Sequence, residues 1–287
     1  MKALEKRNDG IFLSNIPNLL NLESDHVRIK VHTIGLCRTD LNVANGIIPI
    51  QNNLILGHEF SGHIVLSNFD HLPVGSKVSV NPYFENNKFM GLDFNGVLVE
   101  FIDVHYSKVF KTDSLQLTYK HLAYLEPIAA SMAPILKIKD KSLKGGVYGN
   151  NRIAELTSLI LKNLKYNVEL LNPQNTYEIN SFDYIIETTP NEKDLQTIFE
   201  LIKPNGQMIL KSRKNILTGI NFSYLVSKQL DLTAVNYIDF SQALSWLENN
   251  YSLINHLFGE SYNIESWKMA FHDATQSDSK KIFIEMD

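Results

Sequence analysis

The chain has 287 residues, enough for two modest domains, and its 27 basic and 31 acidic residues leave no basic footprint for nucleic acid. The longest apolar-rich stretch, residues 122–138, contains Glu126 and two prolines and does not predict a membrane span. The single cysteine cannot form an intramolecular disulfide and the N-terminus has no apolar signal-peptide core, so we expect a cytoplasmic protein without membrane partners.

The first part of the chain, residues 1–115, reads as short strands separated by turns. Apolar and polar residues alternate in HVRIKVHTIGL (26–36), as in a half-buried strand. Similar patterns follow at residues 59–67, 75–84 and 97–105, with glycine, proline and asparagine between them. These patterns indicate a compact β-rich domain.

The pattern changes near Leu117. A helix is predicted within residues 119–138, and residues 145–172 read as strand, glycine turn, helix and strand, which is one βαβ unit. Further strands and helices alternate over residues 182–250, and this alternation predicts a parallel sheet covered by helices on both faces. The tail, residues 265–287, reads as a helix and then a strand whose docking the pattern does not define.

Cys37 and the motif GHEF, with His58 and Glu59, are the first candidates for chemistry. Thiolate, imidazole and carboxylate are zinc ligands, and a catalytic zinc site uses three protein ligands and keeps one position open. Cys37 and His58 lie 21 positions apart, and this spacing is not diagnostic. From the residues alone, a buried structural cysteine with a hydrogen-bonded core histidine remains the alternative.

The order of several short motifs resembles that of the zinc-dependent medium-chain alcohol dehydrogenases. GLCRTD, LILGHEFSG and YLEPIAASM occur in the family's order, and MKAL at the start and SKKIFIEM near the end extend the resemblance over nearly the whole chain. The resemblance implies an α/β protein with two domains. These are a β-rich GroES-like catalytic domain at residues 1–138 with 251–287, and a Rossmann doubly wound domain at 139–250.

The resemblance assigns Cys37 and His58 as ligands of one catalytic zinc. Glu126, in LEP, matches a ligand carboxylate of the polyol, sugar and threonine dehydrogenase branches. Glu59 matches an acid beside the metal that can itself coordinate, so the choice of third ligand between Glu59 and Glu126 stays open. Many family members have a four-cysteine lobe where residues 81–96 stand here without any cysteine, so no structural zinc is expected.

The neighbours of Cys37 also receive roles from the resemblance. Asp40 matches the carboxylate that orients the ligand histidine, and Thr39 matches the hydroxyl that passes the substrate proton outward. Arg38 matches a position that contacts the cofactor pyrophosphate in some members. Asn42 stands where the family often has a histidine, and an amide does not shuttle protons as imidazole does. His32, His63 and His105 have no family role and are interpreted as ordinary strand or surface histidines.

The cofactor half departs from the family pattern. The expected GxGxxG/A reads GNNRIA, with Gly149 in place but Asn151 where the middle glycine lets the pyrophosphate approach. Arg152 offers a charge near the start of the helix, and Asn172 stands where an acid usually holds the ribose. Residues 172–182 are too short for a further helix and strand and predict only a turn and a strand remnant. We therefore expect a trimmed cofactor domain.

These features favour a zinc-dependent oxidoreductase that transfers a hydride between an alcohol, polyol or sugar hydroxyl and NAD or NADP. The alternative is a family member that binds zinc but has lost dinucleotide-dependent redox activity and binds a metabolite, regulates or serves in a complex. Zinc-assisted chemistry without redox change is a third possibility that nothing in the sequence favours. The resemblance further implies a small-molecule substrate and a homodimer or homotetramer.

Overall fold

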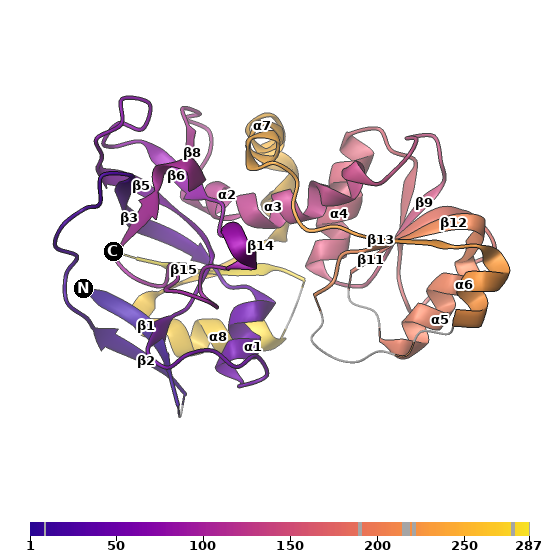
Figure 1. Ribbon diagram of the computed structural model, residues 1–287, viewed down its shortest axis with the longest axis horizontal. Helices are drawn as coiled ribbons and strands as arrows, with labels where there is room; N and C mark the ends of the chain where they lie inside the picture. The colour runs from indigo at the N-terminus through magenta and orange to yellow at the C-terminus, as the bar shows by residue number, and fades with distance from the viewer. Residues whose placement is uncertain (9, 189–190, 214–218, 220–221, 277–278, 287) are drawn as a thin grey trace. The chain divides into compact units, whose positions relative to one another are not determined.

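The computed structural model describes the whole chain except residues 9, 189–190, 214–218, 220–221, 277–278 and 287. Residues 189–190, 214–218 and 220–221 of the predicted alternation of strands and helices over 182–250 thus lie outside the described residues. The chain forms two compact units, one of Met1–Pro127 with Phe240–Asp287 and one of Ile128–Asp239 (Figure 1). The units divide after residues 127 and 239, whereas the sequence analysis placed the domain borders after residues 138 and 250. The assignment of a catalytic and a cofactor domain stays a prediction.

The first unit contains two sheets. In the larger one, β7 pairs with β3 beside the path β14-β15-β3-β5-β6-β8. In the smaller one, the order is β2-β1-β4. The strands are β1 (Lys2–Arg7), β2 (Gly10–Asn15), β3 (His26–Gly35), β4 (Leu54–Ile55), β5 (Glu59–Leu66), β6 (Lys77–Val80), β7 (Phe101–His105), β8 (Val109–Thr112), β14 (Phe258–Asn263) and β15 (Lys281–Glu285).

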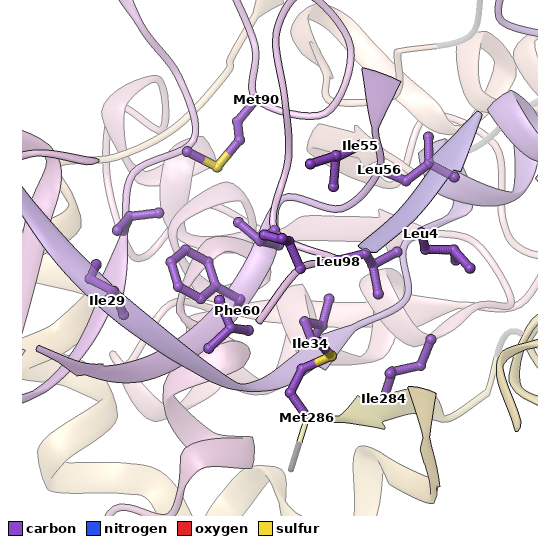
Figure 2. Close-up of a cluster of buried hydrophobic side chains, with 14 of the residues drawn as sticks. Leu4, Ile29, Ile34, Ile55, Leu56, Phe60, Met90, Leu98, Ile284 and Met286 are labelled. Carbon is purple, nitrogen blue, oxygen red and sulfur yellow. The ribbon is translucent and has the colours of Figure 1, made fainter. Parts of the chain in front are cut away.

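The predicted alternation of the first strands is confirmed in the packing. In β3, Val27, Ile29 and Val31 are fully buried and alternate with partly exposed residues. Figure 2 shows side chains from β3, β5 and the C-terminal strand meeting in one apolar cluster. The tail docks here because β15 pairs antiparallel with β3 and buries Ile284 in this cluster.

In the first unit, the single helical run predicted over residues 119–138 begins as α2, but it is segmented and continues past the border of the unit at Pro127. Residues 119–138 form α2 (Tyr119–Ala123), α3 (Leu125–Met132) and a 3₁₀ turn at Ala133–Leu136. Pro134 lies in the first turn of this 3₁₀ segment, where its missing N–H costs nothing. The other helices of this unit are α1 (Arg38–Ala44), α7 (Phe240–Asn250) and α8 (Trp267–Gln276). None of the described helices is long and apolar enough to cross a membrane.

The second unit is a five-stranded parallel sheet in the order β10-β9-β11-β12-β13. Successive side chains of each strand point to opposite faces. Tyr148 and Ile185 pack against α5, whereas Val147 and Ile186 pack against α4. This confirms the predicted doubly wound sheet. The elements are β9 (Gly145–Tyr148), α4 (Arg152–Asn163), β10 (Val168–Leu171), β11 (Phe182–Glu187), α5 (Glu192–Leu201), β12 (Ile202–Leu210), α6 (Phe222–Lys228) and β13 (Asp231–Ala234).

The sheet is trimmed at the β10 edge, as predicted. A complete dinucleotide fold has the strand order 3-2-1-4-5-6, and here β10, in the second position, is the edge. Between β10 and β11 the chain makes only turns, so the predicted strand remnant is not formed. The hydroxyl of Tyr177 instead accepts the N–H of Asn172 at 2.7 Å and closes this short connection.

Candidate metal and cofactor sites

Three residues of the predicted metal set lie together at one end of β3 and β5. Cys37 follows β3 and caps α1, and His58 directly precedes Glu59, the first residue of β5. The antiparallel register places Gly35 opposite Glu59, which brings the two chain segments side by side. Ligand atoms of Cys37, His58 and Glu59 all lie within 4.8 Å of one another. A thiol, an imidazole and a carboxylate in this arrangement fit the ligand types of a zinc ion.

Asp40 connects the two ligand segments. Its Oδ2 accepts the N–H of Cys37 at 2.9 Å, and its Oδ1 accepts the N–H of Gly57 at 3.2 Å. The same Oδ1 lies 3.4 Å from His58 Nδ1. A proton on Nδ1 directed at this buried carboxylate leaves Nε2 of His58 for a metal, as in other carboxylate–histidine–zinc arrangements.

The charges around the site favour a cation. Burial alone lowers the pKa of His58, but Asp40 and Cys37 outweigh it and raise this pKa well above its ordinary value. Burial also raises the pKa of Glu59, which the ammonium of Lys281 lowers and the nearby charge of Glu126 raises. The negative charges that stabilise a proton on His58 would equally stabilise a divalent cation in its place.

Gly57 permits the close packing behind His58. Its φ is +92°, and a Cβ there would lie 3.0 Å from Val97 and 3.2 Å from the backbone N of Leu98. Val97 N–H donates to the Gly57 carbonyl at 3.1 Å, and the Phe89 ring lies 4.9 Å from the His58 ring. The cysteine-free loop and the residues after it therefore pack behind His58, the predicted metal ligand.

Lys281 is a buried residue that sequence reasoning missed. Its side chain is fully buried, and Nζ donates to the Glu59 carboxylate and, at 3.0 Å, to the Leu36 carbonyl. The same Nζ lies 5.8 Å from the Tyr124 ring centroid. The available signal was a lysine at the start of the apolar strand KIFIE, since buried lysines require partners.

The third ligand remains a prediction. Glu126 lies on α3, is 7% exposed, and raises the pKa of Glu59 through its charge. It is not part of the cluster within 4.8 Å, which contains Glu59. Glu59, however, already accepts from Lys281. Proximity to Cys37 and His58 favours Glu59 as the third ligand, whereas the pairing of Glu59 with Lys281 keeps Glu126 as the other candidate.

The predicted relay residues lie on the first turns of α1. The Thr39 hydroxyl is 3.7 Å from the Cys37 sulfur and is partly exposed, so it can contact both the site and solvent. Arg38 is exposed on the same turn. The Asn42 carbonyl accepts the N–H groups of Ile47 and Ile48, which fixes the turn after the helix. The roles of Arg38 and Thr39 remain predictions.

The turn before α4 keeps the glycine that its geometry requires. A Cβ on Gly149 would lie 2.1 Å from the Thr188 hydroxyl. Asn151 is the N-cap of α4: its Oδ1 accepts the N–H of Ala154 at 2.9 Å, and its Nδ2 donates to Thr188 at 3.0 Å. Asn151 thus occupies the N–H of Ala154, a donor that can bind an anion at this end of the helix.

Two other predicted cofactor residues are engaged within the unit. Arg152 begins α4 and is buried, with only 6% of its surface exposed. Asn172 follows β10, and its Oδ1 accepts the N–H of Gln174 at 3.0 Å in a local turn. Gly149 and Ala154 fit the dinucleotide pattern, whereas the amide of Asn151 obstructs it.

Comparison with known proteins places these features in a family context. Residues 23–114 match the alcohol dehydrogenase GroES-like domain. The chain is 22% identical to the sorbitol dehydrogenase of Bacillus subtilis (strain 168) over 314 aligned positions, which cover 89% of this chain and 88% of that protein. It is 37% identical over 67 residues to the D-xylulose reductase of Morganella morganii, which covers 21% of this chain and 20% of that protein.

The fold has close counterparts among solved structures. The 2R,3R-butanediol dehydrogenase from Bacillus subtilis superposes with a TM-score of 0.87 at 22% identity, over 100% of this chain and 99% of that one. This likeness shows the shared fold, with its β-rich first unit and its parallel-sheet second unit.

Proposed function

Since the chain belongs to the medium-chain alcohol dehydrogenase family, we propose that it is a zinc-dependent oxidoreductase with a nicotinamide cofactor. It transfers a hydride between that cofactor and the carbon that carries the hydroxyl of an alcohol, polyol or sugar. The relatives named for sorbitol and D-xylulose support this substrate class. The findings in favour of the alternative, a redox-inactive member that binds zinc, are the amide of Asn151 and the missing strand beyond β10.

The observation that carries the proposal is the convergence of Cys37, His58 and Glu59 within 4.8 Å around a site organised by Asp40. One zinc bound there, with Glu59 or Glu126 as third ligand, supplies Lewis-acid polarisation of the substrate hydroxyl. Cys37 and His58 come from segments that Asp40 holds together, so the ligands are in place before the metal binds.

The remaining chemistry falls to residues beside the ligands. Thr39 lies within 3.7 Å of the Cys37 sulfur and accepts the hydroxyl proton of the substrate. With asparagine at position 42, water takes over the next transfer to solvent. Lys281 offsets the charge of Glu59, which lowers the cost of placing a second carboxylate, Glu126, in the same region.

The second unit supplies the cofactor site. Ligands of open parallel sheets bind beyond the carboxyl ends of the strands, which in this unit includes the Gly149 turn after β9. Gly149, Arg152 and Asn172 are the proposed cofactor contacts of this unit. Asn151 must release the N–H of Ala154 to admit a pyrophosphate. Asn172 carries no charge, so this position has neither the acid that favours NAD nor a base that favours NADP.

Metal analysis and cofactor titration test this proposal. The purified protein is expected to retain about one zinc per chain through dialysis, and the Cys37→Ser variant is expected to lose it. Fluorescence titration should show saturable NADH or NADPH binding, and a panel of polyols should reduce NAD(P). Unchanged zinc in Cys37→Ser contradicts the site. Absence of cofactor binding at millimolar concentration contradicts the dehydrogenase function.

Two further proposals need separate tests. Sedimentation tests the proposed homodimer or homotetramer, and cell fractionation tests the proposed cytoplasmic location.

A further inference from the structure

Four side chains with metal-binding groups meet where β3 begins and β7 ends. His26 is the first residue of β3 and His105 is the last of β7, and the antiparallel register pairs them directly. Glu23 and Asp25 belong to the turn that precedes β3. His105, an ordinary surface histidine by sequence, therefore lies opposite a second histidine and beside two carboxylates.

Two of the atomic separations are close to those around a tetrahedral zinc ion, and Glu23, Asp25 and His26 offer ligand atoms that all lie within 4.8 Å of one another. His26 Nδ1 lies 2.7 Å from Asp25 Oδ1 and 3.5 Å from Glu23 Oε2, and His105 Nε2 lies 3.6 Å from Asp25 Oδ2. Zinc bonds of 2.0–2.2 Å place neighbouring ligand atoms about 3.4 Å apart and two ligand imidazole centres about 5 Å apart. The two ring centroids here are 5.6 Å apart. Small side-chain rotations would suffice for coordination.

Backbone hydrogen bonds hold the four residues in place. His26 N–H donates to the Glu23 carbonyl at 3.1 Å, and Tyr106 N–H donates to the Asp25 carbonyl at 3.0 Å. His105 Nδ1 accepts the N–H of Ser107 at 3.3 Å and lies 2.8 Å from Ser107 Oγ, and these contacts hold the ring with its Nε2 edge toward Asp25. The site is therefore positioned by the strand pairing and the turn before any ion arrives.

We propose that Glu23, Asp25, His26 and His105 form a second metal site that binds Zn²⁺ or a similar divalent transition cation. The two imidazoles distinguish this cluster from an acidic patch, because imidazole selects transition metals over Ca²⁺ and Mg²⁺. The bound ion would link the start of β3, the end of β7 and the turn that precedes β3.

This site is separate from the proposed catalytic zinc. β3 runs ten residues from His26 to Gly35, which at roughly 3.3 Å per residue puts about 30 Å between the two sites. The ligand side chains are between 24% and 80% exposed, so the ion exchanges with solvent and binds more weakly than one held by the buried cluster. The inference therefore does not rest on the proposed function.

Equilibrium dialysis against nanomolar to micromolar free Zn²⁺ tests the proposal. The wild-type chain should bind one more zinc than His105→Gln and than a His26→Gln/Asp25→Asn variant. His71→Gln, which removes another exposed histidine, is the matched control and should bind as many ions as the wild type. Cys37→Ser should lose the tight ion and keep the weaker one, so failure of the two sites can be told apart.

A second measurement uses the wild-type chain alone, in case a variant is unstable. Imidazole ¹H–¹⁵N spectra of zinc-loaded protein titrated with further Zn²⁺ should show shifts confined to two histidines, His26 and His105, and in His105→Gln the shift of His26 should disappear as well. Equal zinc counts in the wild type and His105→Gln overturn the proposal. So does a titration in which no imidazole resonance shifts, which would identify the cluster as a solvated hydrogen-bonded group.

Discussion

Asn151 Oδ1 accepts the N–H of Ala154 at 2.9 Å, so the first turn of α4 is capped by the residue that replaces the middle glycine of the dinucleotide motif. In a phosphate-binding turn this donor faces the ligand. The cap is held on its other side by the 3.0 Å hydrogen bond from Asn151 Nδ2 to Thr188. The side chain of Asn151 thus occupies the N–H of Ala154, which a cofactor phosphate would otherwise bind.

Asn151→Gly should therefore tighten NADH binding. The substitution removes the amide from the turn and frees the N–H of Ala154, and we expect at least about fivefold tighter binding, or ~1 kcal/mol. Replacing an asparagine cap by glycine should cost only a few tenths of a kcal/mol in stability. Fluorescence titration gives the dissociation constant. Asn191→Gly, at the N-cap of α5, is the control and should leave it unchanged. Equal or weaker binding by Asn151→Gly would show that the cap is not the obstacle.

Lys281→Met should destabilise the protein strongly. The change leaves the Glu59 carboxylate buried without its ammonium partner, and breaking such a pair costs about 3–5 kcal/mol. Urea unfolding of the metal-free protein measures the loss. Lys280→Met, at the exposed neighbouring position, should stay within about 0.5 kcal/mol of the wild type. Adding Glu59→Gln to Lys281→Met should restore part of the stability, since the unpaired charge is then gone. Similar losses in both single lysine variants would contradict a structural ion pair.

Local patterns predicted much of the fold. Alternation predicted β3 and β5, and the switch in periodicity predicted the β9-α4-β10 unit. The short segment after Asn172 correctly indicated a missing strand, because a helix and a strand need more residues than it offers. The predicted strand remnant failed because the turn at Asn172 and the hydroxyl of Tyr177 close the connection instead.

The site was less accessible to sequence reasoning. The contact of Lys281 with Glu59 joins residues 222 positions apart, and only the pairing of β15 with β3 brings them together. The pairing of His26 with His105 depends in the same way on the register of β3 and β7. The cap at Asn151 had a local signal, an asparagine three residues before the N–H that it accepts, but the sequence analysis treated this residue only as a replaced glycine.

Stability should decrease below neutral pH through His121. Burial lowers the pKa of His121, while its hydrogen bond to Asn255 opposes that effect. The folded chain then holds fewer protons than the unfolded one below the ordinary pKa of about 6.5. This contribution is fully present above that pH and is lost as pH falls toward the folded pKa. His121→Gln should therefore show a smaller drop in Tm between about pH 8 and about pH 5.5 than the wild type.

The control for His121 is His272→Gln, which removes an exposed histidine from α8. Its drop in Tm over the same range should match that of the wild type. His32 and His63 also have lowered pKa values through burial, so part of the acid sensitivity should persist in His121→Gln. An identical drop in the wild type and His121→Gln would show that His121 does not contribute.

Gly57→Ala should weaken both the fold and zinc retention. Its φ of +92° disfavours any side chain, at about 1–2 kcal/mol, and the added Cβ would also crowd Val97 and Leu98. Gly75→Ala is the matched control, because Gly75 has a φ of +89° but a Cβ added there would meet no atom within 4 Å. Crowding should add about 1–3 kcal/mol to the loss at Gly57 alone, measured by urea unfolding. Gly57 directly precedes His58, so Gly57→Ala should release zinc to a chelator faster than the wild type, and Gly75→Ala should not. Equal release rates in the two variants would show that Gly57 does not help to position His58.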